Sequence, residues 1–472
     1  MKSAKAKSGS HPKQKSRGSR SESTGASAGP EEKQGLRSRQ TAAKILGAVI
    51  DRKTPLDGML DAEHGNAAYA ALSEADRALV RAIINTALRH LPRIEAILNS
   101  LVETPLPEGA RALHHVLAVA AAQILYLDVP DHSAVDIAVD QAKADPRNRR
   151  FANLVNAVLR RLAREKANHL SAVQSIPAIP SWFFDRLVDV YGREHALRIS
   201  EAQLVPAPID LTVKSDPEQW AARLGGSVLP TGTVRLSAFS GTVPSLEGFA
   251  EGEWWVQDAA ASIPAKLFGN VEGQSVADLC AAPGGKTAQL VLAGAKVTAL
   301  DQSASRLRRL VGNLDRLRLQ ASTIEANAGN FRPEFPFDAV LLDAPCSSTG
   351  TIRRHPDVLW TKGPQDIAKL AEVQEKLLRH AMGMVKPGGK LVFSNCSLDP
   401  LEGEEVTKHV LASQPEWTIE PVDAKNWQGL EQAITALGEI RTTPAMFPAH
   451  DSAAGGMDGF YAVVLRRLGT SS

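Results

Sequence analysis

The three cysteines are the residues of this chain with the clearest potential for chemistry. Cys280, Cys346 and Cys396 each follow a short apolar stretch typical of a buried β-strand, and the 472-residue chain holds no other cysteine. Ligands of open α/β sheets bind beyond the carboxyl ends of the strands. Three thiols at such ends therefore predict thiol chemistry beside a bound ligand. The alternative is three small buried side chains, because free cysteine packs like a small hydrophobe.

A glycine-rich loop begins at the first cysteine and runs to Thr287, near which a helix is expected to begin. Two glycines let a ligand approach the backbone, and the helix N-terminus offers free N–H groups. The loop fits the end of the NTPase phosphate loop, G-x-x-x-x-G-K-[ST], but Cys280 stands where that motif requires its first glycine. We expect the loop to bind a cofactor through residues Cys280, Ala281, Ala282, Pro283, Gly284, Gly285 and Lys286.

The kind of cofactor is indicated by Asp301, which ends the next predicted strand. This acid comes sixteen residues after Gly285. An acid at the tip of the second strand is the usual partner of a ribose diol, and an NTPase has no need of it. The full G-x-G-x-x-G motif of dinucleotide-binding proteins is missing from the chain. These features favour a ribose-bearing cofactor without a pyrophosphate, and S-adenosylmethionine fits best.

A second motif, Asp343-Ala-Pro-Cys346, ends another predicted strand. Its proline makes the loop rigid and directs the acid and the thiol toward the ligand crevice. Two thiols on neighbouring strand ends beside a methyl donor suggest methylation at C5 of a pyrimidine. This carbon is a poor nucleophile until a thiolate adds at C6, and loss of the C5 proton after methylation expels the enzyme. One cysteine attacks, and a second can assist release.

These motifs resemble those of the RNA 5-methylcytosine methyltransferases of the Nol1/Nop2/Sun family, in particular bacterial members that act on small-subunit ribosomal RNA. The resemblance covers nearly the whole chain after the first residues. Further matches are Trp255-Val-Gln-Asp-Ala259, Ile352-Arg-Arg-His-Pro-Asp357 and Gly456-Met-Asp-Gly-Phe-Tyr461. The N-terminal region is similar to NusB-type RNA-binding domains through Asp76-Arg-Ala-Leu-Val-Arg81, Val129-Pro-Asp-His132 and Leu154-Val-Asn-Ala-Val-Leu-Arg160.

The resemblance assigns different roles to the three thiols. It implies that Cys396 is the nucleophile and that Cys346 assists product release. Cys280 would belong to the cofactor loop, so its sulfur need not react. The resemblance also implies that S-adenosylmethionine is the cofactor and 16S ribosomal RNA the substrate.

The charged site residues also receive roles from the resemblance. Asp301 would hold the ribose, Asp343 would lie between methyl donor and target base, and Lys286 would support the site electrostatically. Two positions depart from the family pattern. Asn327 stands where the family usually has an acid for the adenine amino group, and its amide oxygen can still accept that hydrogen bond. Asn395 precedes the nucleophile where the family usually has threonine.

The composition along the chain predicts four regions and a multidomain protein. Residues 1–35 begin with seven Lys/Arg and no acid in the first twenty positions, which predicts a disordered basic tail that attracts RNA or is dispensable. Residues 36–168 carry apolar residues at helical spacing, typical of an all-α bundle. Residues 169–270 mix helix and strand patterns, as in a small α/β extension. Residues 271–472 alternate strand and helix, which predicts a Rossmann-like, doubly wound parallel sheet.

Arginines crowd the end of the helical region. The segment between Pro146 and Ala163 contains no acid. A phosphate-binding patch is therefore favoured over an ordinary solvated helix surface. We expect this patch to contain Arg149, Arg150, Arg160 and Arg161, and the loop with Arg353 and Arg354 to contact nucleotides close to the target.

The remaining features exclude several classes of protein. The cysteines are odd in number and form no C-x-x-C pair, so neither a disulfide framework nor a metal site is indicated. The N-terminus has no apolar run, and the stretch 116–127 is too short to span a bilayer. A cytoplasmic monomer is expected. Two other functions stay open, a NusB-like RNA-binding factor without catalysis and a P-loop-like NTPase.

Overall fold

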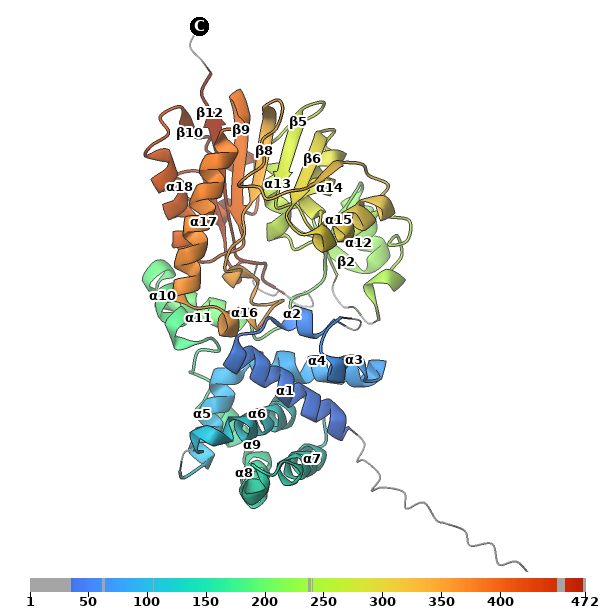
Figure 1. The fold of residues 1–472 in the computed structure, drawn as a ribbon, viewed down its shortest axis with the longest axis vertical. Coiled ribbons are helices and arrows are strands. Elements are labelled where there is room, and N and C mark those ends of the chain that lie inside the picture. Colours follow the sequence, from blue (N-terminus) through green and yellow to red (C-terminus); the bar gives the residue numbers. More distant parts are fainter. Residues whose placement is uncertain are drawn as a thin grey trace, which may run out of the picture.

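The structure is a computed structural model, and it describes residues 35–61, 64–104, 106–236, 239, 241–447 and 455–469. The predicted basic tail, apart from Gly35, lies outside the described residues. A helical part forms one end of the elongated molecule and a large sheet the other (Figure 1). No helix in the described ranges is long and apolar enough to cross a membrane.

The helical part has the all-α architecture that the apolar spacing predicts. Ser73 accepts a hydrogen bond from the backbone N–H of Asp76 and so caps the helix that follows it. Leu46, Ile83 and Leu117 come from three different helices and are buried in one core. The helices are α1 (Leu36–Arg52), α2 (Leu56–Met59), α3 (Ala67–Ala70), α4 (Glu74–Arg89), α5 (Leu91–Leu101), α6 (Arg111–Tyr126), α7 (Asp131–Ala144), α8 (Ala152–Arg164) and α9 (Lys166–Ala172).

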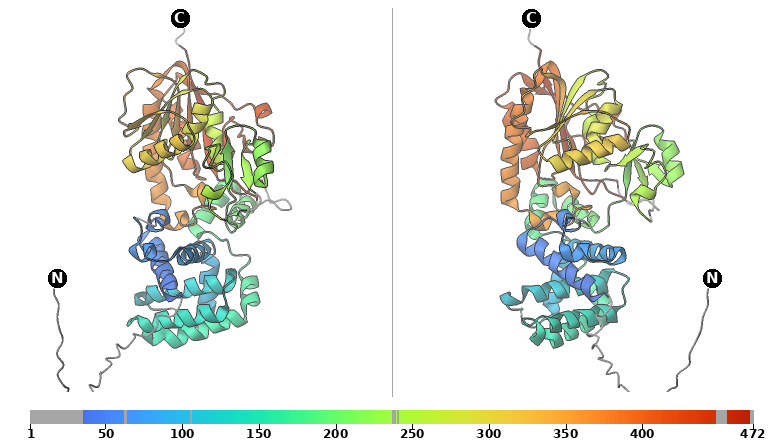
Figure 2. Two further views of the ribbon diagram at one scale, coloured as in Figure 1. Left: turned by 90° about the vertical axis from the view of Figure 1, so that its right-hand side faces the viewer. Right: turned by 45° about the vertical axis from the view of Figure 1, so that its right-hand side comes forward.

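Two helices and a small antiparallel sheet connect the helical part to the large sheet. The strand order of the small sheet is β2-β3-β1-β4. Figure 2 shows this sheet to one side of the large one. The elements are α10 (Ser181–Tyr191), α11 (Arg193–Ala202), β1 (Asp210–Val213), α12 (Pro217–Leu224), β2 (Gly226–Val228), β3 (Val234–Leu236) and β4 (Trp254–Val256).

The large sheet has the strand order β10-β12-β9-β8-β5-β6-β7, and β11 pairs with β12. The five strands from β9 to β7 run parallel, as predicted. The strands are β5 (Ser275–Leu279), β6 (Lys296–Asp301), β7 (Ser322–Glu325), β8 (Phe337–Asp343), β9 (Val385–Asn395), β10 (Trp417–Ile419), β11 (Ile440–Thr442) and β12 (Phe460–Arg467).

The predicted parallel sheet is extended by a strand that the sequence analysis did not predict, β12, which runs antiparallel to β9. A buried strand reads as a continuous apolar run whatever its direction, so the sequence carried no sign of the reversal. The reversal matters for the site. Tyr461 near the start of β12 pairs with Asn395 at the end of β9, so the residues just before β12 reach the carboxyl edge of the sheet.

Helices cover both faces of the large sheet. Along β8, Ala339 and Leu341 contribute to the core on one face, and Val340 and Leu342 to the core on the other. This alternation follows from the two-residue repeat of a strand. The first face carries α13 (Ile263–Lys266) and α14 (Gly285–Leu292), and α15 (Ala304–Arg316) packs beside them. The second face carries α17 (Pro364–Met382) and α18 (Glu404–Leu411).

The helical part contacts the loop that leads into α16 (Val358–Thr361). The buried guanidinium of Arg89 donates to the carbonyl oxygens of Gln203 and Arg353 at 2.6 and 2.5 Å. The backbone N–H of Leu56, at the start of α2, donates to Asp357 Oδ2 at 2.9 Å. The segment from Arg353 to Asp357 contains no strand or helix. These contacts from the helical part fix its position next to the large sheet.

Candidate active site

Two of the three thiols lie side by side at the carboxyl edge of the sheet. The parallel strands β8 and β9 are neighbours, with Asp343 opposite Ser394, so the residues that follow each strand meet. Cys346 Sγ lies 3.4 Å from Cys396 Sγ. The hydrogen bond between them lowers the pKa of Cys396 and raises that of Cys346. Cys396 is therefore the thiol of the pair that ionises more readily.

Cys280 has a different environment. It begins the loop between β5 and α14 with a left-handed backbone, φ 63°, and packs against the core beneath the sheet edge. Burial raises the pKa of its thiol to about 12. A thiol that stays protonated is a poor nucleophile.

The glycine-rich loop is held tightly against the sheet and α15. Gly284 precedes α14 at φ 102°, and an added Cβ would lie 2.9 Å from Leu310 Cγ, so both conformation and space require glycine. Asp301 is buried at the end of β6, and its Oδ2 accepts from the N–H of Ala282 at 3.3 Å. The predicted ribose-binding acid thus contacts the predicted cofactor loop.

Lys286 and Asp343 form an ion pair, with Nζ 2.7 Å from Oδ2. The other carboxylate oxygen of Asp343 accepts from Ser394 Oγ at 3.0 Å. The Lys286 ammonium also lies 4.9 Å from the centre of the Phe460 ring, which the antiparallel β12 contributes. These contacts fix the orientation of Asp343 beside the thiols.

A cavity of about 370 Å³ lies next to these residues. Asp278 on its wall is fully buried, and burial raises its pKa to about 7. Its Oδ2 accepts from Thr287 Oγ1 at 2.6 Å, whereas its Oδ1 has no hydrogen-bond partner among the described residues. The wall also includes Trp255, Gln257, Cys280, Gly284, Gly285, Lys286, Asn313, Arg316, Asp343 and Arg354.

Asn327 is exposed, two residues beyond the end of β7, and outside the wall of this cavity. Its amide oxygen accepts from the N–H of Gly329 at 2.8 Å. A carbonyl oxygen has a second lone pair, so one acceptor site of the amide is still available.

The two arginines of the predicted nucleotide-contacting loop differ sharply. Arg353 is 1% exposed and donates to the carbonyl oxygen of Gly455 at 2.7 Å, so the expected contact with RNA does not fit its position. Arg354 is 40% exposed, lines the cavity and donates from Nε to Asp458 Oδ2 at 2.9 Å. The sequence could not show which of the two arginines is buried and which is exposed, because they are adjacent and share every local signal.

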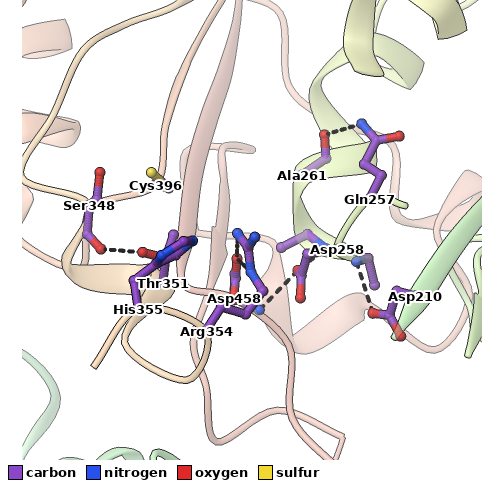
Figure 3. Close-up of polar contacts among 12 residues, drawn as sticks. Asp210, Gln257, Asp258, Ala261, Ser348, Thr351, Arg354, His355, Cys396 and Asp458 are labelled. Carbon is purple, nitrogen blue, oxygen red and sulfur yellow. Dashed lines mark hydrogen bonds and ion pairs between the residues drawn. The ribbon is translucent and has the colours of Figure 1, made fainter. Parts of the chain in front are cut away.

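Arg354 is held by a buried network that reaches the small sheet (Figure 3). Asp258 Oδ1 accepts from the N–H of Asp458 at 3.0 Å. Asp210, at the start of β1, accepts from the N–H of Ala259 at 3.1 Å and pairs with the buried Arg235. From the sequence, the motif around Asp258 showed only a family resemblance, and no local signal predicted that it links the two sheets.

Glu402 is a functional candidate that the sequence analysis missed. It is fully buried and accepts hydrogen bonds from the backbone N–H and the hydroxyl of Ser347, the first at 2.7 Å, and from Ser397 Oγ at 2.6 Å. These serines directly follow Cys346 and Cys396. One carboxylate therefore joins the two cysteine loops, and the only sequence signal was an acid six residues after Cys396.

The predicted phosphate-binding arginines lie far from the cavity. All four are exposed. Figure 1 places α8 at the end of the helical part away from the large sheet. Among the residues that the structure describes, their side chains make only local contacts: Arg149 donates to the Lys143 carbonyl, Arg150 lies over the Phe151 ring, Arg160 donates to Asn156, and Arg161 pairs with Glu165.

Comparison with known proteins agrees with both halves of the fold. The family described as 16S rRNA methyltransferase RsmB/F matches residues 265–466, and the NusB family matches residues 36–164. Ribosomal RNA small subunit methyltransferase B of Vibrio vulnificus is 35% identical over 450 residues, 90% of this chain and 98% of that protein. The Xylella fastidiosa protein of that name is 37% identical over 393 residues, 80% and 89% of the two chains. The solved structure of PH0851 has the same fold, with a TM-score of 0.68 at 21% identity over 92% of this chain and 98% of that chain.

The fold and the site define a Rossmann-like methyltransferase joined to a NusB-type helical domain. Within this class, the chain belongs to the ribosomal RNA small subunit methyltransferase B family.

Proposed function

We propose that this protein transfers a methyl group from S-adenosylmethionine to C5 of a cytosine in 16S ribosomal RNA, through a covalent bond between Cys396 and C6. The observation that carries the proposal is the pair of thiols 3.4 Å apart, next to the Lys286–Asp343 ion pair. The family assignment supports the ribosomal substrate. Residues 36–168 and 169–270 would bind RNA, and residues 271–472 would catalyse the transfer.

The described residues fit S-adenosylmethionine. The free Oδ1 of the buried Asp278 needs a donor, which the ammonium of the methionine moiety would supply. Asp301 would accept from the ribose hydroxyls, Asn327 from the adenine amino group, and the loop from Cys280 to Lys286 would lie against the ligand. When bound, this cofactor supplies an electrophilic methyl group.

The protein's own residues would act in a fixed order. The Cys396 thiolate adds to C6, which places the electron pair of the C5–C6 double bond at C5. Asp343, held by Lys286 and Ser394, orients the base while C5 takes the methyl group. The C5 proton then passes to solvent, its electron pair re-forms the C5–C6 double bond, and the bond from Cys396 Sγ to C6 breaks to regenerate the thiolate, with Cys346 assisting this release.

Radiolabelled methyl transfer to unmodified 16S ribosomal RNA tests the proposal. We expect label from S-adenosylmethionine to appear as 5-methylcytosine after nuclease digestion of the RNA. ATP hydrolysis without methyl transfer would favour the NTPase alternative. RNA binding without either activity would favour a NusB-like binding factor.

Simultaneous replacement of Arg149, Arg150, Arg160 and Arg161 by alanine is expected to weaken binding of long ribosomal RNA. For each arginine that binds a phosphate, its removal should lower the slope of log affinity against log salt by roughly one unit. Titrations at several salt concentrations measure this slope. Because α8 lies away from the cavity, a short RNA that contains only the target region should bind the variant normally. Unchanged affinity for long RNA would indicate that residues 169–270, rather than these four arginines, bind it.

A further inference from the structure

One stripe of α15 faces the cavity and the loop beside it. Arg306 and Asn313 donate to carbonyl oxygens of the loop between β5 and α14, at 2.7 and 2.9 Å. Arg316, three residues after Asn313, lines the cavity. Residues three, four and seven apart lie on one face of a helix. Arg309 is three residues after Arg306 and four before Asn313, so it belongs to this stripe.

Arg309 is the member of the stripe that is free to bind something else. Its side chain is exposed, whereas those of Arg306 and Arg316 donate to backbone carbonyls. Within the described part of the chain, Arg309 has no hydrogen bond and no ion pair. Gly312, one turn further along, adds no side chain that could cover it, and a Cβ built there would meet no atom within 4 Å.

The helical part presents an acid to the same region. Asp57 on α2 is 80% exposed, and its Oδ2 lies 3.5 Å from His355 Nδ1. The hydrogen bond from His355 lowers the pKa of Asp57, and the charges of His355, Arg354 and Arg309 act in the same direction. The exposed Asp57 carboxylate thus contacts His355, in the loop before α16. Arg309 of α15 and Arg354 lie near enough for their charges to act on it.

We propose that Arg309, His355 and Arg354 bind a backbone phosphate of the RNA beside the target nucleotide. In the free protein, the Asp57 carboxylate occupies the position of this phosphate until RNA binds. This inference rests on the proposed function. A base that undergoes chemistry must leave its stack, and the backbone on either side must then be held near the cavity mouth. Guanidinium groups bind phosphate through paired, charge-assisted hydrogen bonds.

The neighbouring Arg308 offers a matched control. It is exposed on the same helix, but one residue along the chain turns the side chain by about 100° around the axis, away from the stripe. Arg308→Ala and Arg309→Ala therefore remove the same charge from the same element. Binding of a short unmodified RNA with the target region is measured against salt, together with single-turnover methyl transfer and S-adenosylmethionine binding.

Arg309→Ala is expected to weaken RNA binding by about fivefold to tenfold and to lower the salt slope by roughly one unit. Arg308→Ala should leave both near the unmodified values, and cofactor binding should be unchanged in both variants. Asp57→Asn should tighten RNA binding, because it removes the competing negative charge.

Equal losses in the two arginine variants, or no loss in Arg309→Ala, would overturn the phosphate site. Unchanged or weaker RNA binding by Asp57→Asn would overturn the role of the carboxylate. If the unmodified protein binds the RNA but transfers no methyl group to it, the proposed function fails, and the comparison of the two arginine variants still decides whether the phosphate site exists.

Discussion

Replacing Cys346 by alanine is expected to trap a covalent complex between the protein and its RNA, whereas Cys396→Ala should form no complex. Without Cys346, the adduct at C6 still forms and is methylated, but the step that releases it is slowed. Without Cys396 no bond to C6 can form, and turnover should fall by roughly 10⁶-fold, the loss found when the nucleophile of a serine protease is removed. A denaturing gel with labelled RNA and S-adenosylmethionine measures the adduct.

Cys280→Ala is the control for this pair of variants. Its thiol lies in the predicted cofactor loop, and burial raises its pKa to about 12, so its loss should leave adduct formation and release in their normal order. Accumulation of adduct in the Cys396 variant rather than in the Cys346 variant would reverse the assignment of the two thiols.

The juxtaposition of the thiols could be predicted because it depends on local signals. Cys346 and Cys396 follow two recognisable apolar strands, and parallel strands direct the residues after them to one edge of the sheet. The sequence did not establish that β8 and β9 are neighbours. The structure confirms the juxtaposition, with 3.4 Å between the sulfur atoms.

Features that depend on contacts distant in sequence could not be predicted. Arg353 and Arg354 have the same local sequence pattern. Arg353 is buried with a hydrogen bond to Gly455, whereas Asp458 holds Arg354 at the wall of the cavity. The antiparallel β12, which delivers Asp458, has the apolar composition of a parallel buried strand.

The kind of fold along the chain, helical first and then a strand–helix sheet, could be predicted, but the coupling between these parts could not. Arg89 in the helical part donates to the carbonyl oxygen of Arg353, and Leu56 donates to Asp357. The loop between these contacts carries Arg354, which lines the cavity, and His355, which faces Asp57. The helical part therefore positions a wall of the active site as well as carrying the predicted RNA-binding arginines.

Glu402→Ala is expected to slow methyl transfer by roughly 10²-fold, the effect of a displacement of about 1 Å in reacting groups. The carboxylate is the shared acceptor for Ser347 and Ser397, and its removal leaves the buried backbone N–H of Ser347 without its acceptor. The two cysteine loops then lose a shared anchor, so the position of the Cys396 thiol relative to Cys346 is held less firmly. Glu402→Gln keeps one acceptor oxygen and should give an intermediate rate. Single-turnover adduct formation measures the effect.

Glu439→Ala separates this positioning effect from a general loss of stability. Glu439 is also buried and accepts from two hydroxyl groups, Tyr461 Oη at 2.6 Å and Thr435 Oγ1 at 3.2 Å, but it touches neither cysteine loop. Both variants should lower the melting temperature, and at a temperature where both are folded only Glu402→Ala should slow adduct formation. Equal rates in the two variants would mean that Glu402 stabilises the fold without aligning the thiols. A slower rate confined to Glu402→Ala would mean that the alignment of Cys346 and Cys396 depends on a carboxylate that never meets the substrate.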